Sequence, residues 1–254
     1  MSKYIEKVEQ LVLPVIPLRG LVVFPGIPTS FEISNARSIA ALEAAVSSDN
    51  RVFLSLLEDV ENEQVRLCPM GVYARVKQAM KLPDGNYRVL VEARRRGEYT
   101  EIIEGKDYLR ATVLTKKIII TDNGGLRGQA LRAEMIASFE EHMRKIPKLS
   151  PDILVSVQAI TDPGMLADYV AANLLFDFRN KQKVLETVDP FERLELVSML
   201  LRQEGEVIDI KNELHEKVRE RINGNQRDYF LREQLKVIHE ELGDAPGADP
   251  EDEE

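Results

Sequence analysis

The chain has 254 residues, one cysteine and a net charge of −9. This length suits one large domain or two small ones with a substantial apolar core. No apolar run approaches the roughly 18–20 residues that cross a bilayer, the start MSKYIEKVEQ is too charged for a secretory signal, and the lone Cys68 excludes an internal disulfide framework. We therefore expect a cytoplasmic protein without a membrane partner.

The negative charge is concentrated near the C-terminal end. Residues 240–254 contain eight acidic residues and no basic one, and removing those eight charges from −9 leaves about −1 for the rest of the chain. A nearly neutral body with an acidic tail lacks the basic face that general nucleic-acid binding requires. The sequence therefore argues against a nucleic-acid partner.

Residues 1–120 carry the patterns of short β-strands, with one exception. The stretch SNARSIAALEAAVSS, residues 34–48, follows a Ser or Asn cap with apolar residues three and four apart, which predicts a short amphipathic helix. Because proline cannot donate to a sheet ladder, four prolines indicate edge strands, bulges and turns in the first strands. These prolines are Pro14, Pro17, Pro25 and Pro28.

A hairpin is the clearest strand signal. Residues 71–82 and 87–93 alternate apolar and polar positions around the sequence PDGN, in which Asp84-Gly85 supplies the turn. RVFLSLLE is a candidate buried strand, and residues 97–103 and 108–120 add further strands. Half a dozen short strands with one helix predict a small, partly closed, barrel-like sheet over residues 1–120.

After residue 120 the pattern becomes helical. Proline and aspartate mark most of the helix starts, which is their usual position. We expect helices over residues 131–145, from 150–151, over 161–175 and over 177–187, and a last one from Asp189-Pro190. The predicted fold class is therefore α+β: a β-rich subdomain (1–120), a helical bundle (121–190), a long helix (191–243) and an acidic tail (244–254).

The last predicted helix has no proline from residue 191 to residue 243. About 52 residues at roughly 1.5 Å each make a rod of about 75–80 Å, so we expect it to project from the compact body. Gly205 and Gly224 are the expected points of bending or breakage. One narrow stripe along it has coiled-coil-like spacing. The stripe contains Val207, Ile210, Leu214, Val218, Ile222, Leu231, Leu235, Ile238 and Leu242.

No group of residues forms a recognisable catalytic or metal site. The chain has no GxxxxGK[ST] motif, and the GGLRG at residues 124–128 is interpreted as a turn. His215 and His239 each precede a glutamate, but the second histidine of HExxH is missing both times. We interpret all three histidines, including His142, as surface residues and Cys68 as a small packed hydrophobe.

Two other features have competing interpretations. The run Arg94-Arg95-Arg96 fits a solvated, ion-paired turn better than a nucleic-acid contact, because acidic residues flank it. Apolar residues beside turns either cover the core or form an adaptable surface that binds unrelated peptides. These candidate substrate-contact residues are Phe24, Pro25, Met80 and Leu82.

Several stretches resemble the N-terminal domain of the bacterial ATP-dependent Lon protease family. LPVIPLRGLVVFPGIPTSFEI is similar to the opening of that domain, and GVYARVKQAMKLPDGNYRVLVEARRRGEY to its central hairpin. NQRDYFLREQLKVIHEELG, the most specific match, is similar to the family's long helix. The resemblance extends from about Leu11 to Gly243.

The resemblance implies a noncatalytic module of a cytoplasmic homohexameric protease. In that family an ATPase module, which uses ATP and Mg²⁺, and a serine–lysine protease module follow this domain; neither is found in this chain, which therefore looks like an excised piece without a cofactor of its own. We expect the β-rich part to recognise unfolded or damaged polypeptide. We expect the long helix to pack between subunits through Leu231, Leu235, Ile238 and Leu242, supporting assembly and gating. The alternative is a purely structural spacer.

Overall fold

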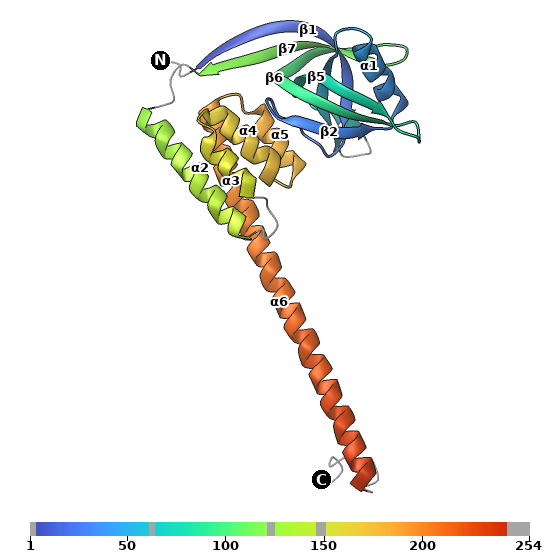
Figure 1. Cartoon of the computed structure of the whole chain (residues 1–254), viewed down its shortest axis with the longest axis vertical. Helices are drawn as coiled ribbons and strands as arrows, with labels where there is room; N and C mark the ends of the chain where they lie inside the picture. Colours follow the sequence, from blue (N-terminus) through green and yellow to red (C-terminus); the bar gives the residue numbers. More distant parts are fainter. Residues whose placement is uncertain (1–3, 61–63, 121–124, 146–150, 243–254) are drawn as a thin grey trace. The chain divides into compact units, whose positions relative to one another are not determined.

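The computed structural model describes residues 4–60, 64–120, 125–145 and 151–242 (Figure 1). Within these residues seven strands form one sheet, and the neighbour order β1–β7–β6–β5–β3 returns to β1 through a parallel pairing of residues 15–18 with residues 53–56. The sheet therefore closes into a barrel, to which β4 adds beside β3 and β2 beside β6. The strands are β1 (Tyr4–Leu18), β2 (Pro28–Ile33), β3 (Arg51–Val60), β4 (Gln64–Leu67), β5 (Met70–Lys81), β6 (Tyr87–Glu104) and β7 (Leu109–Ile120).

The prediction of short strands is wrong for β1 and β6, which have 15 and 18 residues. β1 runs through Pro14 and Pro17, and β6 joins the second hairpin strand to the strand expected at residues 97–103. A register shift between Tyr99 and Glu101 marks an irregularity in the β6–β7 pairing. Such bulges let a strand bend around a barrel without ending.

The predicted hairpin between β5 and β6 is confirmed. Gly85 has φ +87°, a conformation that favours glycine, and the Leu82 amide donates to the Asn86 carbonyl across the turn. The predicted short helix is α1 (Ala36–Val46), and the Asn35 side chain caps it by accepting from two first-turn amides. Its buried face lies against β1 and β3.

Five further helices follow in the described chain: α2 (Gly125–Lys145), α3 (Pro151–Ala159), α4 (Pro163–Leu174), α5 (Phe178–Glu186) and α6 (Pro190–Leu242). The side chains of Asp162, Asp177 and Asp189 accept hydrogen bonds from amides of the first turns of α4, α5 and α6, so these predicted starts are confirmed. α2 begins at Gly125 rather than residue 131, so the turn expected at residues 124–128 is wrong from Gly125 onward.

The chain divides into two compact units, Met1–Glu204 and Gly205–Glu254. Within the first unit the larger apolar cluster continues from the barrel into the helices, since it includes Leu54, Met135 and Leu194. A second, smaller cluster around Phe53 lies within the barrel. α6 contributes its first turns to the first unit and includes both Gly205 and Gly224 without interruption. Among the described residues, no helix is long and apolar enough to span a membrane.

Candidate functional site

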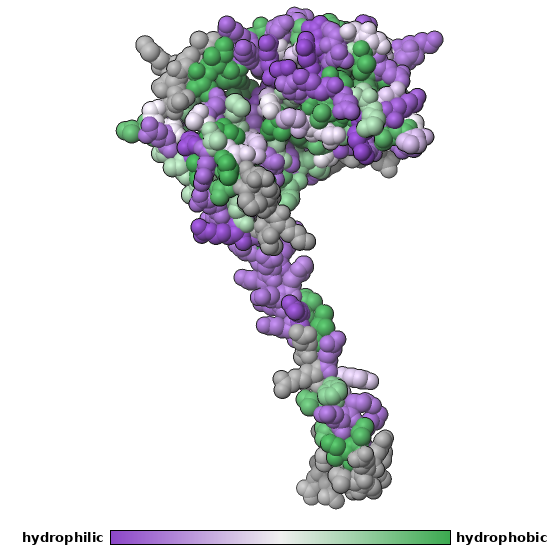
Figure 2. Space-filling model, in the orientation of Figure 1, coloured by the Kyte–Doolittle hydropathy of each residue, from purple (hydrophilic) through white to green (hydrophobic). Residues whose placement is uncertain are grey.

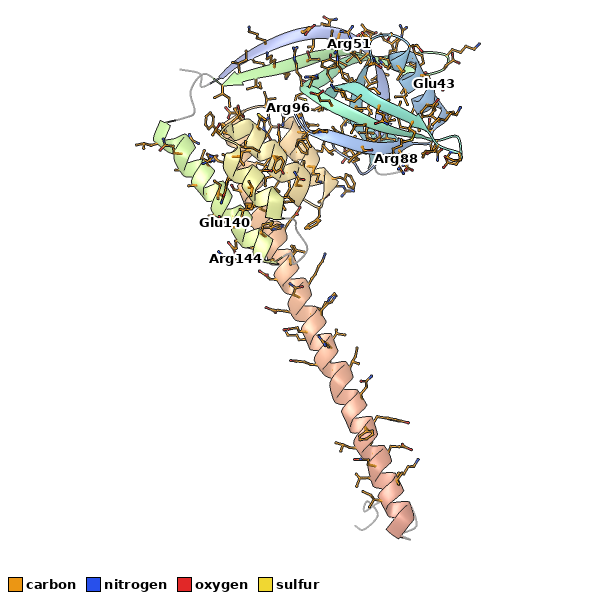
Figure 3. All side chains as sticks on the ribbon, viewed as in Figure 1. Glu43, Arg51, Arg88, Arg96, Glu140 and Arg144 are labelled. Carbon is orange, nitrogen blue, oxygen red and sulfur yellow. The ribbon has the colours of Figure 1, made fainter. Side chains whose placement is uncertain are left out.

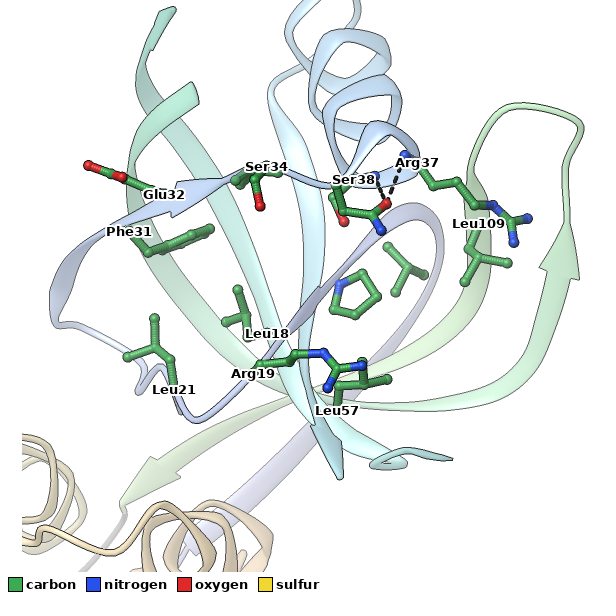
Figure 4. Close-up of a pocket in the computed structure, with 14 residues that line it drawn as sticks. Leu18, Arg19, Leu21, Phe31, Glu32, Ser34, Arg37, Ser38, Leu57 and Leu109 are labelled. Atoms are coloured by element: carbon green, nitrogen blue, oxygen red, sulfur yellow. Dashed lines mark hydrogen bonds between the residues drawn. The ribbon is translucent and has the colours of Figure 1, made fainter. Parts of the chain in front are cut away.

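An apolar pocket of about 390 Å³ lies between the end of β1 and β2 (Figure 4). The segment after β1, the first turn of α1, β3 and β7 also contribute to its walls. A concave apolar surface at the mouth of a barrel is a common place for ligand binding. The apolar lining residues are Val15, Pro17, Leu18, Leu21, Phe31, Ile33, Leu57 and Leu109.

The strand pairing explains why the pocket forms here. Residues 4–14 of β1 pair with β7, whereas residues 15–18 pair with β3. β2 pairs with residues 87–92 of β6, on the side opposite β5, and has no second partner among the described strands. The barrel wall is therefore open between β2 and the last residues of β1, and the pocket lies in this opening. We call it the barrel opening.

The rim of the barrel opening is cationic. Arg19, just after β1, and Arg37, in the first turn of α1, are both exposed and line the pocket (Figure 4). The acid in the lining, Glu32, accepts hydrogen bonds of 2.6 and 3.2 Å from the Arg88 guanidinium on β6. Because Arg88 compensates that carboxylate, the site combines an apolar interior with the exposed guanidinium of Arg37 at its rim.

The four predicted substrate-contact residues lie outside the barrel opening. Phe24 is only 1% exposed and belongs to the core, so of the two interpretations given above its ring follows the first, an apolar residue that covers the core. Its neighbours Val22 and Val23 are buried as well, because this segment packs inward before the turn at Pro25. Met80 is 47% exposed near the end of β5, and Pro25 and Leu82 are half-buried. Substrate contact by these last three stays a prediction.

Sequence reasoning missed the residues that line the barrel opening. Leu21, Phe31 and Leu109 meet there although Leu109 is far from the other two in the chain. Each of them looks like an ordinary core residue in its own strand or turn. The deciding signal is a long-range one: β2 pairs with β6 along one edge, and no described strand pairs with its other edge. Local periodicity does not carry this information.

The part of α6 that belongs to the second unit, from Gly205 to Leu242, is called the exposed part of α6. It carries the residues predicted to pack between subunits. Leu231, Leu235 and Ile238 are 47–55% exposed, and Figure 2 shows apolar side chains on this part of the helix. The Leu242 side chain lies outside the described residues. Tyr229 and Phe230, 69% and 61% exposed, were missed because they fall off the stripe that sequence spacing selects. Packing between subunits stays a prediction.

Arg96 corrects the interpretation of the arginine run as a solvated turn. It lies inside β6 (Figure 3). It is 4% exposed and donates to both carboxylate oxygens of Asp168 on α4 at 2.6 and 2.8 Å. Its Nε also donates to the Leu185 carbonyl at 2.9 Å. Arg193 of α6 contacts the same carboxylate, Nε to Oδ1, at 3.2 Å, and burial lowers the pKa of Arg193 to about 10. This buried ion cluster joins the barrel to the helices.

A second pocket, of about 290 Å³, borders the ion cluster and has several basic side chains in its lining. Three of these bases already contact carboxylates of the sheet, which weakens the pocket as a site for an anion. The contacts are Arg94–Glu92 at 3.0 Å, Arg95–Glu9 at 2.8 Å and Lys116–Glu98 at 3.4 Å.

The other titratable candidates have structural surroundings. His142 is 2% exposed beside the Phe176 ring, so its interpretation as a surface residue is wrong, and burial lowers its pKa. His215 is exposed as expected, and the His239 side chain lies outside the described residues. Cys68 is buried, and burial raises its pKa to about 11, which fits the predicted packed hydrophobe and disfavours a thiolate nucleophile.

Residues 12–203, nearly the whole of the first compact unit, match the family model described as the ATP-dependent protease La (LON) substrate-binding domain. The chain belongs to the Lon protease family. The barrel opening lies entirely within the residues that match the Lon model, whereas the exposed part of α6 lies beyond them.

Similar Lon proteins support this assignment along the chain. The Lon protease of Brevibacillus choshinensis is 37% identical over 238 residues, covering 92% of this chain and 30% of the relative. That of Escherichia coli is 30% identical over 251 residues, covering 98% and 32%. This chain therefore spans about 30% of the length of such relatives.

A solved structure supports the fold. The N-terminal domain of the Mycobacterium avium complex Lon protease superposes with a TM-score of 0.54 at 23% identity, covering 76% of this chain and 98% of that one. The α+β fold class and the resemblance to Lon N-terminal domains are thereby confirmed.

Proposed function

We propose that the unit Met1–Glu204 recognises unfolded or damaged polypeptide for a cytoplasmic Lon protease, and that the barrel opening is its binding site. The observation that carries the proposal is an apolar pocket within the residues that match the substrate-binding model. Folded proteins bury most of their large apolar side chains, whereas non-native chains expose them. A pocket that takes such a side chain therefore selects non-native polypeptide.

The end of the β5–β6 hairpin supplies a second contact in this proposal. Met80 is exposed there, and an unbranched, polarisable side chain adapts to different apolar partners. Leu82 is accessible enough to add a contact there, whereas half-buried Pro25 lies beside Arg94 and Arg95 at the second pocket and buried Phe24 is no longer included.

The exposed part of α6 supports a role in assembly. Its apolar residues would be covered by other subunits of a homohexamer, and six weak sites in one ring would bind a long chain more tightly through avidity. The proposal assigns three activities to the complete protease and none of them to this unit: ATP hydrolysis with Mg²⁺, serine-protease cleavage and gating. The alternative, a structural spacer, is favoured by the same exposed apolar residues.

Fluorescence anisotropy distinguishes recognition from a spacer role. One labelled protein is titrated with this chain in its folded form and in a permanently unfolded form. We expect binding to the unfolded form only, weakened by Met80→Ser, while Met199→Ser, at an exposed methionine of α6, serves as the matched control. Absence of binding to both forms well above micromolar concentration would favour the spacer.

A further inference from the structure

We propose that the polypeptide binds as an added β-strand along the free edge of β2, with an apolar side chain in the barrel opening and an acidic neighbour beside Arg37. The inference rests on the proposed function and deepens it. It specifies the conformation of the bound segment, which is extended, and its chemistry, which is an apolar residue flanked by acidic ones.

The first observation is the unpaired edge of β2. Its residues pair with β6 from Pro28↔Glu92 to Ile33↔Tyr87. Among the described residues, no backbone hydrogen bond outside this ladder involves residues 29–33. Ser30 and Glu32 are exposed, so solvent reaches the strand. An edge with open N–H and C=O groups is a template for one more strand.

The other wall of the barrel opening is the end of β1, and comparing it with β2 explains why an incoming strand would pair with β2. Residues 15–18 of β1 already use one edge for β3. Pro17, which lines the pocket, has no N–H to donate. β2 carries its proline at its first residue, Pro28, and residues 29–33 keep their donors. An incoming segment therefore finds a more complete set of donors and acceptors on β2.

The second observation is that the pocket lies on one face of β2. Phe31 and Ile33 are two residues apart, so their side chains share a face, and both line the barrel opening. On an added strand, alternate side chains would point to the same face. One apolar side chain would enter beside Leu21 and Leu109, while its neighbours would point to solvent. Backbone pairing plus a single apolar position accepts many sequences, which a binder of unrelated non-native chains requires.

The third observation is the charge of the rim. Arg37 is an exposed cation at the mouth of the pocket, and Glu32 is engaged by Arg88. A carboxylate beside the bound apolar residue would come close to the Arg37 guanidinium. Complementary charge of this kind fixes register and selects among partners. The site should therefore prefer acid-flanked apolar segments to lysine-flanked ones.

The test of strand addition uses methylated backbones. A labelled peptide has a central phenylalanine, an aspartate on each side of it, and alternating valine and threonine beyond them. Two versions carry N-methyl groups on alternate residues in opposite phase, so each blocks the donors of one edge only. We expect one version to bind this chain at least about tenfold more weakly than the parent peptide and the other to bind about equally. Equal binding by both versions, or equal loss in both, would overturn strand addition.

Two variants test the pocket and its rim. Arg37→Glu should weaken binding of the aspartate-flanked peptide about three- to tenfold and should not weaken binding of a lysine-flanked one. Arg179→Glu is the matched control, because Arg179 is also exposed and also gives its amide to an aspartate or asparagine cap at a helix start. Ser34→Trp places a ring over the exposed mouth of the pocket and should reduce binding of both peptides.

The outcomes separate this inference from the proposed function. If this chain binds a permanently unfolded protein but the two methylated peptides behave alike, recognition stands and strand addition fails. If Arg37→Glu and Arg179→Glu weaken the aspartate-flanked peptide equally, the preference for acidic flanks fails. If neither unfolded protein nor parent peptide binds, the proposed function fails first.

Discussion

The helix α6 crosses two regions, and the contrast between them shows what decides burial. Leu194 and Val197 are fully buried in the core of the unit Met1–Glu204. Leu214 and Val218, at similar helical spacing in the unit Gly205–Glu254, are 58% and 47% exposed. The apolar periodicity is alike in both regions. Periodicity therefore identifies a face that can be buried, and only the packing partners decide whether it is.

Ion pairs differ between the two units in the same way as apolar residues: the first unit contains a buried cluster, and the second unit contains an exposed pair. In the first unit Asp168 and the two arginines that contact it are almost completely buried. In the second unit Lys217 and Glu213 are 70% and 73% exposed and lie 3.7 Å apart on one helix face. Removing one partner of a buried pair leaves an uncompensated charge, whereas an exposed pair contributes little. The four predictions below test these contrasts.

The largest effect is expected at Asp168. Asp168→Ala leaves Arg96 and Arg193 buried without their carboxylate, and we expect a loss of about 3–5 kcal/mol in the free energy of unfolding. Urea unfolding measures it. The control Arg202→Gln removes the exposed ion pair with Glu134, 3.0 Å, and should cost less than about 1 kcal/mol. Similar small losses in both variants would show that the buried cluster contributes no more than a surface pair.

A leucine pair compares the two regions of α6 directly. Leu194→Ala creates a cavity in the core and should cost about 2–5 kcal/mol. Leu214→Ala changes an exposed position and should stay within about 0.5 kcal/mol. The readout is again the urea midpoint. A large loss for Leu214→Ala would mean that the second unit is already packed against a partner in solution.

The buried His142 should make the first unit sensitive to acid. Burial lowers its pKa in the folded chain, with nearby Glu204 favouring and Lys145 opposing protonation. The unfolded chain, with a pKa of about 6.5, therefore takes up the proton first. The contribution of neutral His142 to stability is complete at pH values above the unfolded pKa. It is lost as the pH falls from the unfolded pKa towards the lower pKa of the folded chain.

Melting temperatures measured between about pH 7.5 and about pH 5 test this assignment, because the pH dependence of stability reports the difference in pKa between the folded and unfolded chain. His142→Gln should remove part of the decline on acidification, whereas His215→Gln, at an exposed histidine of α6, should leave the decline as it is. Identical pH profiles for the two variants would assign the decline to other groups.

The smallest effect on stability, and the largest on assembly, is expected at the end of α6. Leu235→Asp combined with Ile238→Asp changes exposed side chains, so the melting of the first unit should not change. Sedimentation velocity of the complete protease should show loss of the assembled particle. The control combines Arg232→Asp with Lys236→Asp, off the apolar stripe. An intact particle in the Leu235/Ile238 variant would remove these residues from the intersubunit contact.

The features that could be read from sequence are those with local causes. PDGN specified the β5–β6 turn because Asp84 and Gly85 suit it wherever the strands go. Asp162, Asp177 and Asp189 marked helix starts because a cap bonds to amides two or three residues away. The α+β order followed from these local signals together with the change of pattern near residue 120.

The features that could not be read have long-range causes. Arg96 looked solvated because its buried partner, Asp168, is 72 residues away. Phe24 had two competing interpretations because it precedes a turn, and only the surrounding core decides that it is buried. The barrel opening depends on β1 changing partner from β7 to β3 beside a β2 with one free edge. None of these pairings leaves a trace in the periodicity of a single segment.

The pairing of β1 with β7 also has a consequence for biosynthesis. Residues 4–14 pair with residues 110–120, so the first strand to leave the ribosome has to wait for the last one before the ring can close. At about 5–20 residues per second that interval is on the order of several seconds, and closing so long a loop is slow in itself. α6, whose backbone bonds are all local, forms without such a delay. During its own synthesis, this unit is therefore for some seconds an incomplete β-structure with an open strand edge, the kind of chain that quality-control proteins encounter.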